Sequence, residues 1–540
     1  AMSGKFAMLF AGNILQSVCA LAFRPAVYPI GIIHTVGSIS FSSSFSGAAA
    51  FRPMLTTPDV SKNRLHLRCP SQSCKVSDIV TSAEKSLIPP MPKEIPVEYT
   101  LHGRTRVDPF AWMKDENWQS VLRDPALLRQ DVRSHLEDEN RYVDEVLGKT
   151  KPLQEQLVRE MKGRIEGAES SVPSPDGPFA YFFRYVEGAE HPQLSRISRA
   201  DIPLWCSYAA ALSATASNVT NITAKEAHLT EIAPPASLET LLDVNALAAG
   251  LDFFRLGGSH HSPDHSRLAY AVDVKGSEYY TISIKNLASV DLLADELVNT
   301  SGEVVWSSDS RYLVYGKMDD NHREKWVYRH EVGTAQGDDV LLYEEPDDGF
   351  FVSVSKTDTG RFIVIDSHDH ETSEVRLLDA AFPDAPTLVH PRQEGLQYEV
   401  EDYGDRLVIL TNADGAVDFK VMESPLASPG KESWADLVPH KAGTFVRGIR
   451  VIEGHLVRAE RSNALPSIVA AKLSRGSGGG LVAGEEHRVA MEEEAYSLGL
   501  AGGYEFNTSQ IRFTYSSPTT PESTFDYDLA SRRRELRKVQ

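Results

Sequence analysis

A serine flanked by glycines is the pattern in this chain closest to known catalytic chemistry. In a G-x-S-x-G elbow, a sharp strand-to-helix turn exposes a nucleophilic serine for acyl transfer, and Asp and His follow it along the chain. No segment of the 540 residues has this pattern. The nearest are Gly257-Gly258-Ser259-His260-His261, which ends in histidine, and Gly476-Ser477-Gly478-Gly479-Gly480, which has Arg475 two residues before its serine. We therefore predict no catalytic residue in this sequence.

Histidines form two closely spaced groups that could suggest a metal site. They are His260, His261 and His265, and His368 with His370. The HExxH and CxxC spacings of common zinc sites are absent from the sequence. Histidines in turns and strands are more often simply solvated, so we expect no metal and no organic cofactor.

Two acidic runs allow a structural and a functional interpretation. Glu344-Glu345 with Asp347-Asp348, and Glu492 to Glu494, are typical of solvated faces. If the run at 344–348 instead faced a central channel, it would concentrate Lys- and Arg-containing peptides there electrostatically.

Composition limits the class of protein. A chain of 540 residues with 41% hydrophobic and 24% charged residues is typical of a soluble protein with two or three folded units. The net charge of −20 argues against a nucleic-acid partner.

Residues 1–88 differ from the remainder and are predicted to be a leader. No Asp or Glu precedes Asp59, and the segment SISFSSSFSG is rich in serine. A basic, acid-poor, serine-rich leader is typical of an organellar transit peptide. We expect a plastid rather than a mitochondrion; a disordered tail on a cytoplasmic protein is the alternative. The apolar stretch 6–23 is interrupted by polar residues and is barely long enough to span, so no stable membrane span is expected.

Residues 89–165 are predicted to be helical. Asp124 and Pro125 form a capping pair. An apolar stripe then continues to Gly148 through Leu128, Val132, Leu136, Val143 and Leu147. A second helix is expected over 152–165.

Residues 166–540 are predicted to be a β-propeller. Four segments share a polar turn, an arginine and a run of apolar residues, with arginines at 267, 311, 361 and 406. Weaker copies surround Phe179, His455 and Ile511, which gives seven units. A period in the mid-forties with several strands per repeat is typical of propeller blades, which must stack because one blade cannot bury both its faces. Residues 201–231 interrupt the period and are expected to be a surface insertion, with an extra hidden blade as the alternative.

Several long segments then resemble a known family. They include TLHGRTRVDPFAWMKDE, FFRLGGSHHSPDHSRLAYAVDVKGSEYYTI and GEVVWSSDSRYLVYGKMDDNHR. These are similar to the oligopeptidase B branch of the prolyl oligopeptidase family of serine peptidases, a branch whose members cleave short peptides after basic residues. The likeness runs from about Pro89 to Gln540.

The resemblance implies a seven-bladed propeller that caps an α/β-hydrolase domain. Residues 89–165 would be the N-terminal helical segment that packs on that domain, and 166–540 the propeller that filters substrates by size. The hydrolase domain, with the catalytic Ser, Asp and His, is expected beyond Gln540, so this chain alone should be inactive. A fragment or incomplete gene model of an active peptidase is favoured over a non-catalytic propeller scaffold. The expected partners are short peptides and the missing hydrolase domain.

Overall fold

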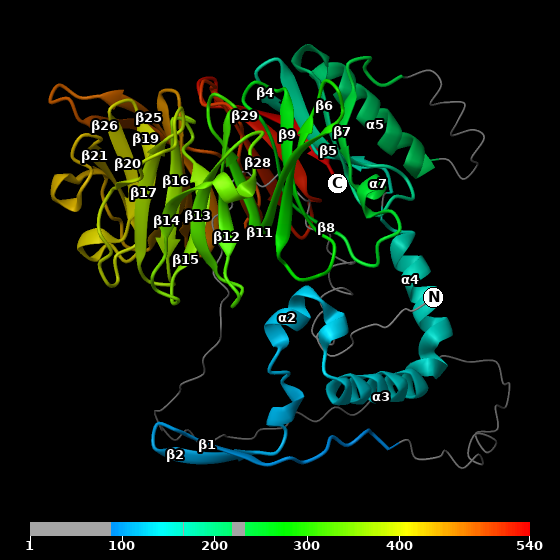
Figure 1. Cartoon of the computed structure of the whole chain (residues 1–540). Helices are drawn as coiled ribbons and strands as arrows, with labels where there is room; N and C mark the ends of the chain where they lie inside the picture. The colour runs from blue at the N-terminus through cyan, green and yellow to red at the C-terminus, as the bar shows by residue number, and fades with distance from the viewer. Residues whose placement is uncertain (1–87, 166, 219–232) are drawn as a thin grey trace, which may run out of the picture.

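The computed structural model describes residues 88–165, 167–218 and 233–540 and is mainly β (Figure 1). The predicted leader therefore lies outside the described residues, apart from Ile88. No helix within the described ranges is long and apolar enough to cross a membrane.

Antiparallel sheets that follow one another along the chain make up most of the described residues from 167 onward (Figure 1). The first sheet contains β3 (Glu169–Ser170), β4 (Ser174–Asp176), β5 (Phe179–Tyr185), β6 (Gln193–Ser198) and β7 (Glu239–Asp243). A seven-stranded sheet follows, with β8 (Arg255–His261), β9 (Arg267–Asp273), β10 (Tyr280–Asn286), β11 (Leu292–Trp306), β12 (Tyr312–Met318), β13 (Glu324–Glu331) and β14 (Val340–Glu344).

Four sheets of four strands complete the arrangement. They are β15 (Phe351–Lys356), β16 (Phe362–His368), β17 (Ser373–Asp379) and β18 (Thr387–Leu388); β19 (Tyr398–Tyr403), β20 (Arg406–Thr411), β21 (Lys420–Pro425) and β22 (Ala435–Val438); β23 (Thr444–Ile452), β24 (His455–Ser462), β25 (Leu465–Arg475) and β26 (Leu481–Arg488); and β27 (Ser497–Ala501), β28 (Gln510–Ser516), β29 (Ser523–Asp528) and β30 (Arg533–Val539).

The prediction of a β-propeller is confirmed. Six of the seven repeat units seen in the sequence fall on the strand that follows the first long strand of a blade-like unit, as with Arg267 at the start of β9 and Arg406 at the start of β20. The unit around Phe179 falls on β5, which follows only the short strands β3 and β4. The blade count is less direct, because pairing gives five separate sheets of blade size and one continuous sheet of seven strands. A count of seven requires the 15-residue strand β11 to belong to two blades.

The core lies between neighbouring sheets. One cluster joins Val314 and Val327 of the seven-stranded sheet to Val354 and Ile363 of the next sheet. Central strands are consequently covered on both faces, and β16 is buried at five consecutive positions. Such strands read as continuous apolar runs because neither face meets water.

The polar turn of each repeat is built from side chains that bind backbone. In the 262–267 turn, the Ser262 hydroxyl accepts from the Arg267 amide at 2.9 Å and the Asp264 carboxylate accepts from the Ser266 amide at 3.0 Å. Ser307 and Asp309 repeat the arrangement one unit later. These turns explain why the recurring Ser, Asp and Arg letters mark the repeat.

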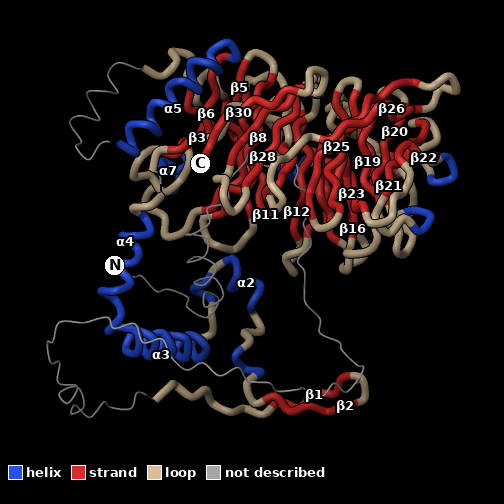
Figure 2. Tube along the Cα trace, turned by 180° about the vertical axis from the view of Figure 1, so that it is seen from behind, coloured by secondary structure: helices blue, strands red, loops and turns tan. Residues whose placement is uncertain are grey.

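The N-terminal segment lies beside one end of the propeller (Figures 1 and 2). It contains the hairpin of β1 (Val97–Leu101) and β2 (Arg104–Asp108), then α2 (Trp118–Arg123), α3 (Gln130–Leu147) and α4 (Lys151–Lys162). Arg123 of α2 forms an ion pair with Asp320 at 2.7 Å and stacks on Tyr279. We call the propeller end that carries the 319–323 loop the near face, and the opposite end the far face.

The predicted start of the first long helix is wrong by several residues. Asp124 caps only the short 3-10 turn at Pro125–Leu127, and Leu128 and Arg129 are extended. The Arg129 amide instead donates to Asp115 at 2.8 Å, which separates this turn from α3. The second helix ends at Lys162 rather than 165, with Gly163 as its C-cap.

The described part of the predicted insertion is a helix. Helix α5 (Ile202–Asn218) connects β6 to β7, which still pair with each other, and residues 219–232 lie outside the described residues. Trp205 of α5 packs on Phe182 of β5 with ring centroids 4.3 Å apart. A further short helix, α7 (Val244–Ala248), follows β7.

Candidate functional site

The two serine segments lie in places that do not resemble a nucleophile elbow. Residues 257–261 belong to β8, an end strand of the seven-stranded sheet that is followed by another strand rather than by a helix. Gly258 is required there by packing, since a Cβ atom would lie 2.7 Å from the carbonyl oxygen of Gly302. Residues 476–480 form the turn between β25 and β26, closed by the Gly476 amide donating to the Gly480 carbonyl at 2.9 Å.

The histidines at 261 and 265 are packed rather than solvated, which corrects the expectation from sequence. The His261 side chain is only 8% exposed, and its Nε2 lies 2.6 Å from Asp176 Oδ2. Its ring stacks on Tyr181 with centroids 3.7 Å apart. The Tyr181 hydroxyl in turn lies 2.9 Å from His265 Nδ1. We call Asp176, Tyr181, His261 and His265 the histidine cluster.

Burial shifts the pKa of two members of this cluster, His265 and Tyr181. It lowers the pKa of His265 and raises the pKa of Tyr181 to about 12. The neighbouring His260 is half-buried, and desolvation together with His261 lowers its pKa to about 4. His265 and His260 are therefore neutral at neutral pH and Tyr181 keeps its proton.

The first strands of several sheets end at the far face and bring further charges there. Lys356 ends β15, and burial lowers its pKa to about 8 despite the attraction of Asp176. Asp358 follows in the next turn, where its Oδ1 lies 2.7 Å from Arg450 Nε and its Oδ2 accepts from the Val451 amide at 2.7 Å. Asp358 thus contacts β23, two sheets further along the chain.

A second carboxylate is held close to Asp358. Glu401 of β19 accepts a hydrogen bond from the Asp358 backbone amide at 2.6 Å. Burial and the Asp358 charge raise the pKa of Glu401 well above its usual value. Burial also raises the pKa of Asp358, although Arg450 opposes the shift. The far face is therefore crossed by a buried polar network that links three successive sheets.

The acidic run at 344–348 is divided between a buried ion pair and the surface. Glu345 is 2% exposed and accepts from Arg392 at 2.7 Å, so it is neither solvated nor open to a channel, and both interpretations were wrong for it. Burial disfavours its charge, but hydrogen bonds from Arg392, Ser367 and Tyr343 prevail and lower its pKa to about 2. The other three acids of the run are exposed, as expected for a solvated face.

The second acidic run is partly structural as well. Glu493 accepts from the Tyr515 hydroxyl at 2.8 Å and from the Thr520 hydroxyl at 2.7 Å.

The second pair of histidines, His368 and His370, consists of one residue with a carboxylate partner and one exposed residue. His368 Nδ1 lies 2.9 Å from Asp366, which raises its pKa, whereas His370 is exposed as expected.

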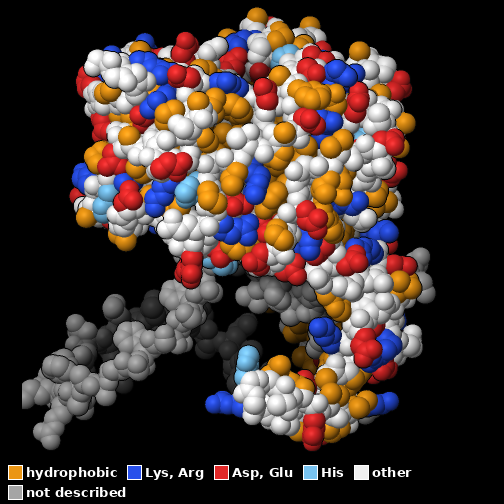
Figure 3. All heavy atoms as spheres, turned by 60° about the vertical axis from the view of Figure 1, so that its left-hand side comes forward, with side chains coloured by type: hydrophobic (Ala, Val, Ile, Leu, Met, Phe, Trp, Pro, Cys, Tyr) orange, Lys and Arg blue, Asp and Glu red, His pale blue; other side chains and the backbone are white. Residues whose placement is uncertain are grey.

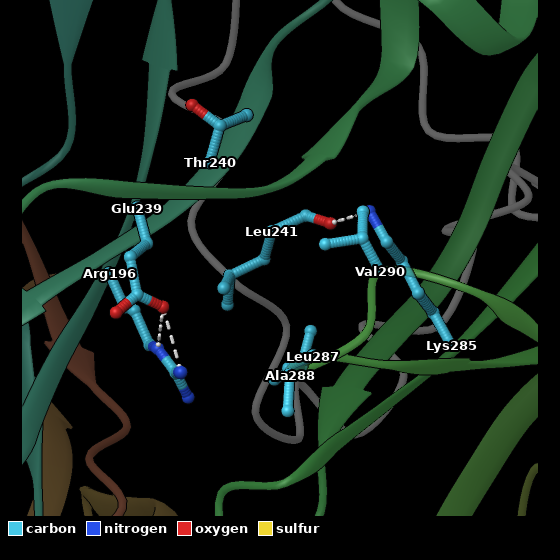
Figure 4. A pocket seen from close by; sticks show the side chains of 8 residues that line it. All are labelled: Arg196, Glu239, Thr240, Leu241, Lys285, Leu287, Ala288 and Val290. Atoms are coloured by element: carbon cyan, nitrogen blue, oxygen red, sulfur yellow. Dashed lines mark hydrogen bonds and ion pairs between the residues drawn. The ribbon is translucent and has the colours of Figure 1, made fainter.

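A pocket of about 480 Å³ opens between the first two sheets (Figure 4). Its charged groups are already engaged: Arg196 pairs with Glu239 at 2.8 Å and Lys285 Nζ donates to the Leu241 carbonyl at 2.7 Å. This pocket offers a shallow polar surface and no reactive pair among the described residues.

Sequence reasoning noticed the histidines of the cluster but missed their partners. Asp176 and His261 are 85 residues apart, and both Asp176 and Asp264 occupy the third position of an SPD repeat turn. The repeat alignment therefore carried a signal that these turns lie in adjacent sheets. Nothing in the sequence indicated that Asp358 would reach Arg450.

Fold and site together define a β-propeller domain with an accessory helical segment. Residues 89–540 match the family described as "Prolyl oligopeptidase, N-terminal beta-propeller domain". The chain therefore belongs to the prolyl oligopeptidase family.

Individual relatives agree. The chain is 34% identical over 468 residues to dipeptidyl aminopeptidase BI of Pseudoxanthomonas mexicana, covering 86% of this chain and 60% of that protein. It is 28% identical over 453 residues to protease 2 of Moraxella lacunata, covering 83% and 58%. Oligopeptidase B from Trypanosoma brucei with covalently bound antipain, in its closed form, superposes with a TM-score of 0.71 at 27% identity, covering 84% of this chain and 60% of that chain. The chain thus spans about 60% of the length of these relatives.

Proposed function

We propose that this chain is the propeller and N-terminal part of an oligopeptidase B-like serine peptidase that hydrolyses short peptides, after basic residues. The observation that carries the proposal is the family match over 89–540, which includes the N-terminal segment as well as the propeller. No G-x-S-x-G occurs in these residues. The reaction therefore depends on a hydrolase domain supplied outside them, which contributes the serine, aspartate and histidine.

The propeller in this proposal has seven blades. Strand β11 pairs with β10 through its first half and with β12 through its second half, with register shifts on both sides. Counting it twice divides the seven-stranded sheet into two blades of four strands. The ring then acts as a size filter, and the polar network at the far face restricts entry along the axis to short peptides.

The N-terminal segment supplies the surface on which the hydrolase domain docks. Fifteen of the 33 exposed large hydrophobic side chains among the described residues lie between Ile88 and Val158. Figure 3 shows the described part of this segment as an arm beside the propeller, with hydrophobic side chains on its surface. Apolar patches of this kind mark interaction surfaces.

The leader is proposed to direct the protein to an organelle, a plastid in preference to a mitochondrion. Import of a fusion of residues 1–88 to a fluorescent protein tests this part separately.

Active-site labelling tests the main proposal. The 540-residue chain should give no adduct with a fluorophosphonate probe. The same chain joined at its C-terminus to the hydrolase domain of the 34%-identical relative should label and should cleave a short arginyl peptide. Labelling of the 540-residue chain at a serine would overturn the assignment. A correctly folded fusion that labels but cleaves no peptide would favour a non-catalytic propeller scaffold.

A further inference from the structure

The histidine cluster gathers donor atoms suited to a metal ion. One atom each from Asp176, His261 and His265 lie within 4.8 Å of one another. Two imidazole nitrogens and one carboxylate oxygen are the donors that zinc-class ions prefer, whereas calcium and magnesium prefer oxygen alone. Three protein ligands leave a fourth tetrahedral position for water.

The donors are already oriented by their neighbours. The Tyr181 hydroxyl is hydrogen-bonded to His265 Nδ1 at 2.9 Å, which leaves Nε2 free to bind the ion. A hydrogen bond to the nitrogen that does not bind the ion fixes the ring of a metal-binding histidine. Gly177 provides the space, since a Cβ atom there would lie 2.8 Å from His265 Nε2. Asp176 Oδ2 and His261 Nε2, 2.6 Å apart, need to separate only slightly to share one ion.

The Asp176 carboxylate supplies the negative charge of the site, which the nearby cations Lys356 and Arg196 oppose. Asp176 is 26% exposed at its side chain, so an ion can reach it from solvent. The Lys356 ammonium is attracted to the same carboxylate but pairs with no acid in the described residues. A divalent ion would therefore replace the Asp176–His261 hydrogen bond and compete with a desolvated lysine that forms no ion pair of its own among the described residues.

We propose that Asp176, His261 and His265 bind one divalent transition-metal ion of the zinc class at the far face of the propeller. The site joins the β4–β5 hairpin of the first sheet to the end of β8 in the next sheet. The same hairpin is tied to the last sheet, because the Gly177 amide donates to Glu505 at 3.2 Å. The ion thus holds together the place where the ring of sheets closes.

Direct titration of the full 540-residue chain tests the site. After removal of metal with a chelator, calorimetry should show one equivalent of Zn²⁺ bound, and Co²⁺ should give the visible absorption of a tetrahedral complex. His265→Asn should weaken Zn²⁺ binding by about 100-fold or more while preserving the fold, because Asn tolerates the left-handed φ of 60° at this position. Tyr181→Phe should weaken it by about 10- to 100-fold.

Exposed His370 provides the control. His370→Asn should leave the Zn²⁺ stoichiometry and affinity unchanged, and Mg²⁺ should not compete in the wild-type chain. Zn²⁺ should raise the melting temperature of the wild type and of His370→Asn but not of His265→Asn. The proposal is overturned if wild type shows no tetrahedral Co²⁺ spectrum, or if His265→Asn binds Zn²⁺ as wild type does. These readouts do not involve peptidase activity, so they stand apart from the proposed function.

Discussion

His330 shows how one buried residue can link stability to pH. Its side chain is fully buried, with Nε2 2.9 Å from Asp295 and Nδ1 2.7 Å from Asp339. Burial opposes a charged ring, but hydrogen bonds to Asp339 and Asp295 and their charges prevail and raise its pKa. Both ring nitrogens face carboxylates, so the folded protein favours the imidazolium.

A raised folded-state pKa predicts a loss of stability with rising pH. The contribution of His330 is fully present below the unfolded value of about 6.5 and disappears as pH rises through the folded value. For the wild type, the urea concentration at the unfolding midpoint should decrease as the pH is raised from about 6. In His330→Asn this decrease should be smaller. His370→Asn should keep the wild-type profile. The same slope in wild type and His330→Asn would contradict the prediction.

At the scale of the sheets, a few side chains join the first sheet to the last sheet and so close the ring. Among the described strands, none is shared by the first sheet and the last sheet. Instead, Arg512 of β28 donates to the carbonyls of Val172 and Pro173 at 3.1 and 3.0 Å. Its Nε donates to the Asp526 carboxylate. Arg199 pairs with Glu505, and Lys538 pairs with Glu169. This seam depends on hydrogen bonds rather than on a shared ladder.

Removal of Arg512 should therefore loosen the seam more than the sheets on either side. In Arg512→Met, amides of β4 and the residues before it should exchange hydrogen about tenfold faster or more, because the hydrogen-bonded cap over 172–174 is lost. Amides of β16 and β20, remote from the seam, should keep their protection. Arg311→Met removes an exposed ion pair with Glu331 and provides the control. Uniform acceleration across all sheets in Arg512→Met would count against a local seam.

At the scale of the whole molecule, the N-terminal segment is the part whose helices bury few of their side chains. Helix α4 buries no side chain, and Leu153 and Leu157 are 55% and 45% exposed. Only Val132 and His135 of α3 are buried. In the apolar stripe found in the sequence, Val143 and Leu147 are exposed, Leu128 and Leu136 are half-buried, and Val132 is buried.

This exposure predicts that α4 binds another protein surface. Leu153→Glu with Leu157→Glu should reduce both binding of a hydrophobic dye and self-association of the chain, and should prevent binding of a co-expressed hydrolase domain. Gln154→Glu with Gln156→Glu adds the same charge at polar positions of the same helix. This control should leave dye binding, self-association and binding of the hydrolase domain unchanged. Equal effects of the two double variants, measured by light scattering and pull-down, would show that charge rather than apolar contact is responsible.

The sequence by itself determined the repeats, and with them the fold. Each polar turn binds its own backbone within a few residues, as in the turn from Ser262 to Arg267, so the local letters report the local structure. Apolar runs such as Phe362 to Ile365 similarly reported strands that are covered on both faces.

Only the tertiary structure decided which polar groups meet. Asp176 finds His261 across 85 residues and Asp358 finds Val451 across 93, because strands of different sheets end at the same face. The predicted roles of isolated residues failed for the same reason: Glu345 looked solvated or channel-facing, yet it is buried because Arg392, 47 residues away in the chain, pairs with it. Charge and burial depend on the neighbours that the stacking of sheets brings together. The repeat alignment indicates which turns lie in adjacent sheets, but it does not indicate which of their side chains pair.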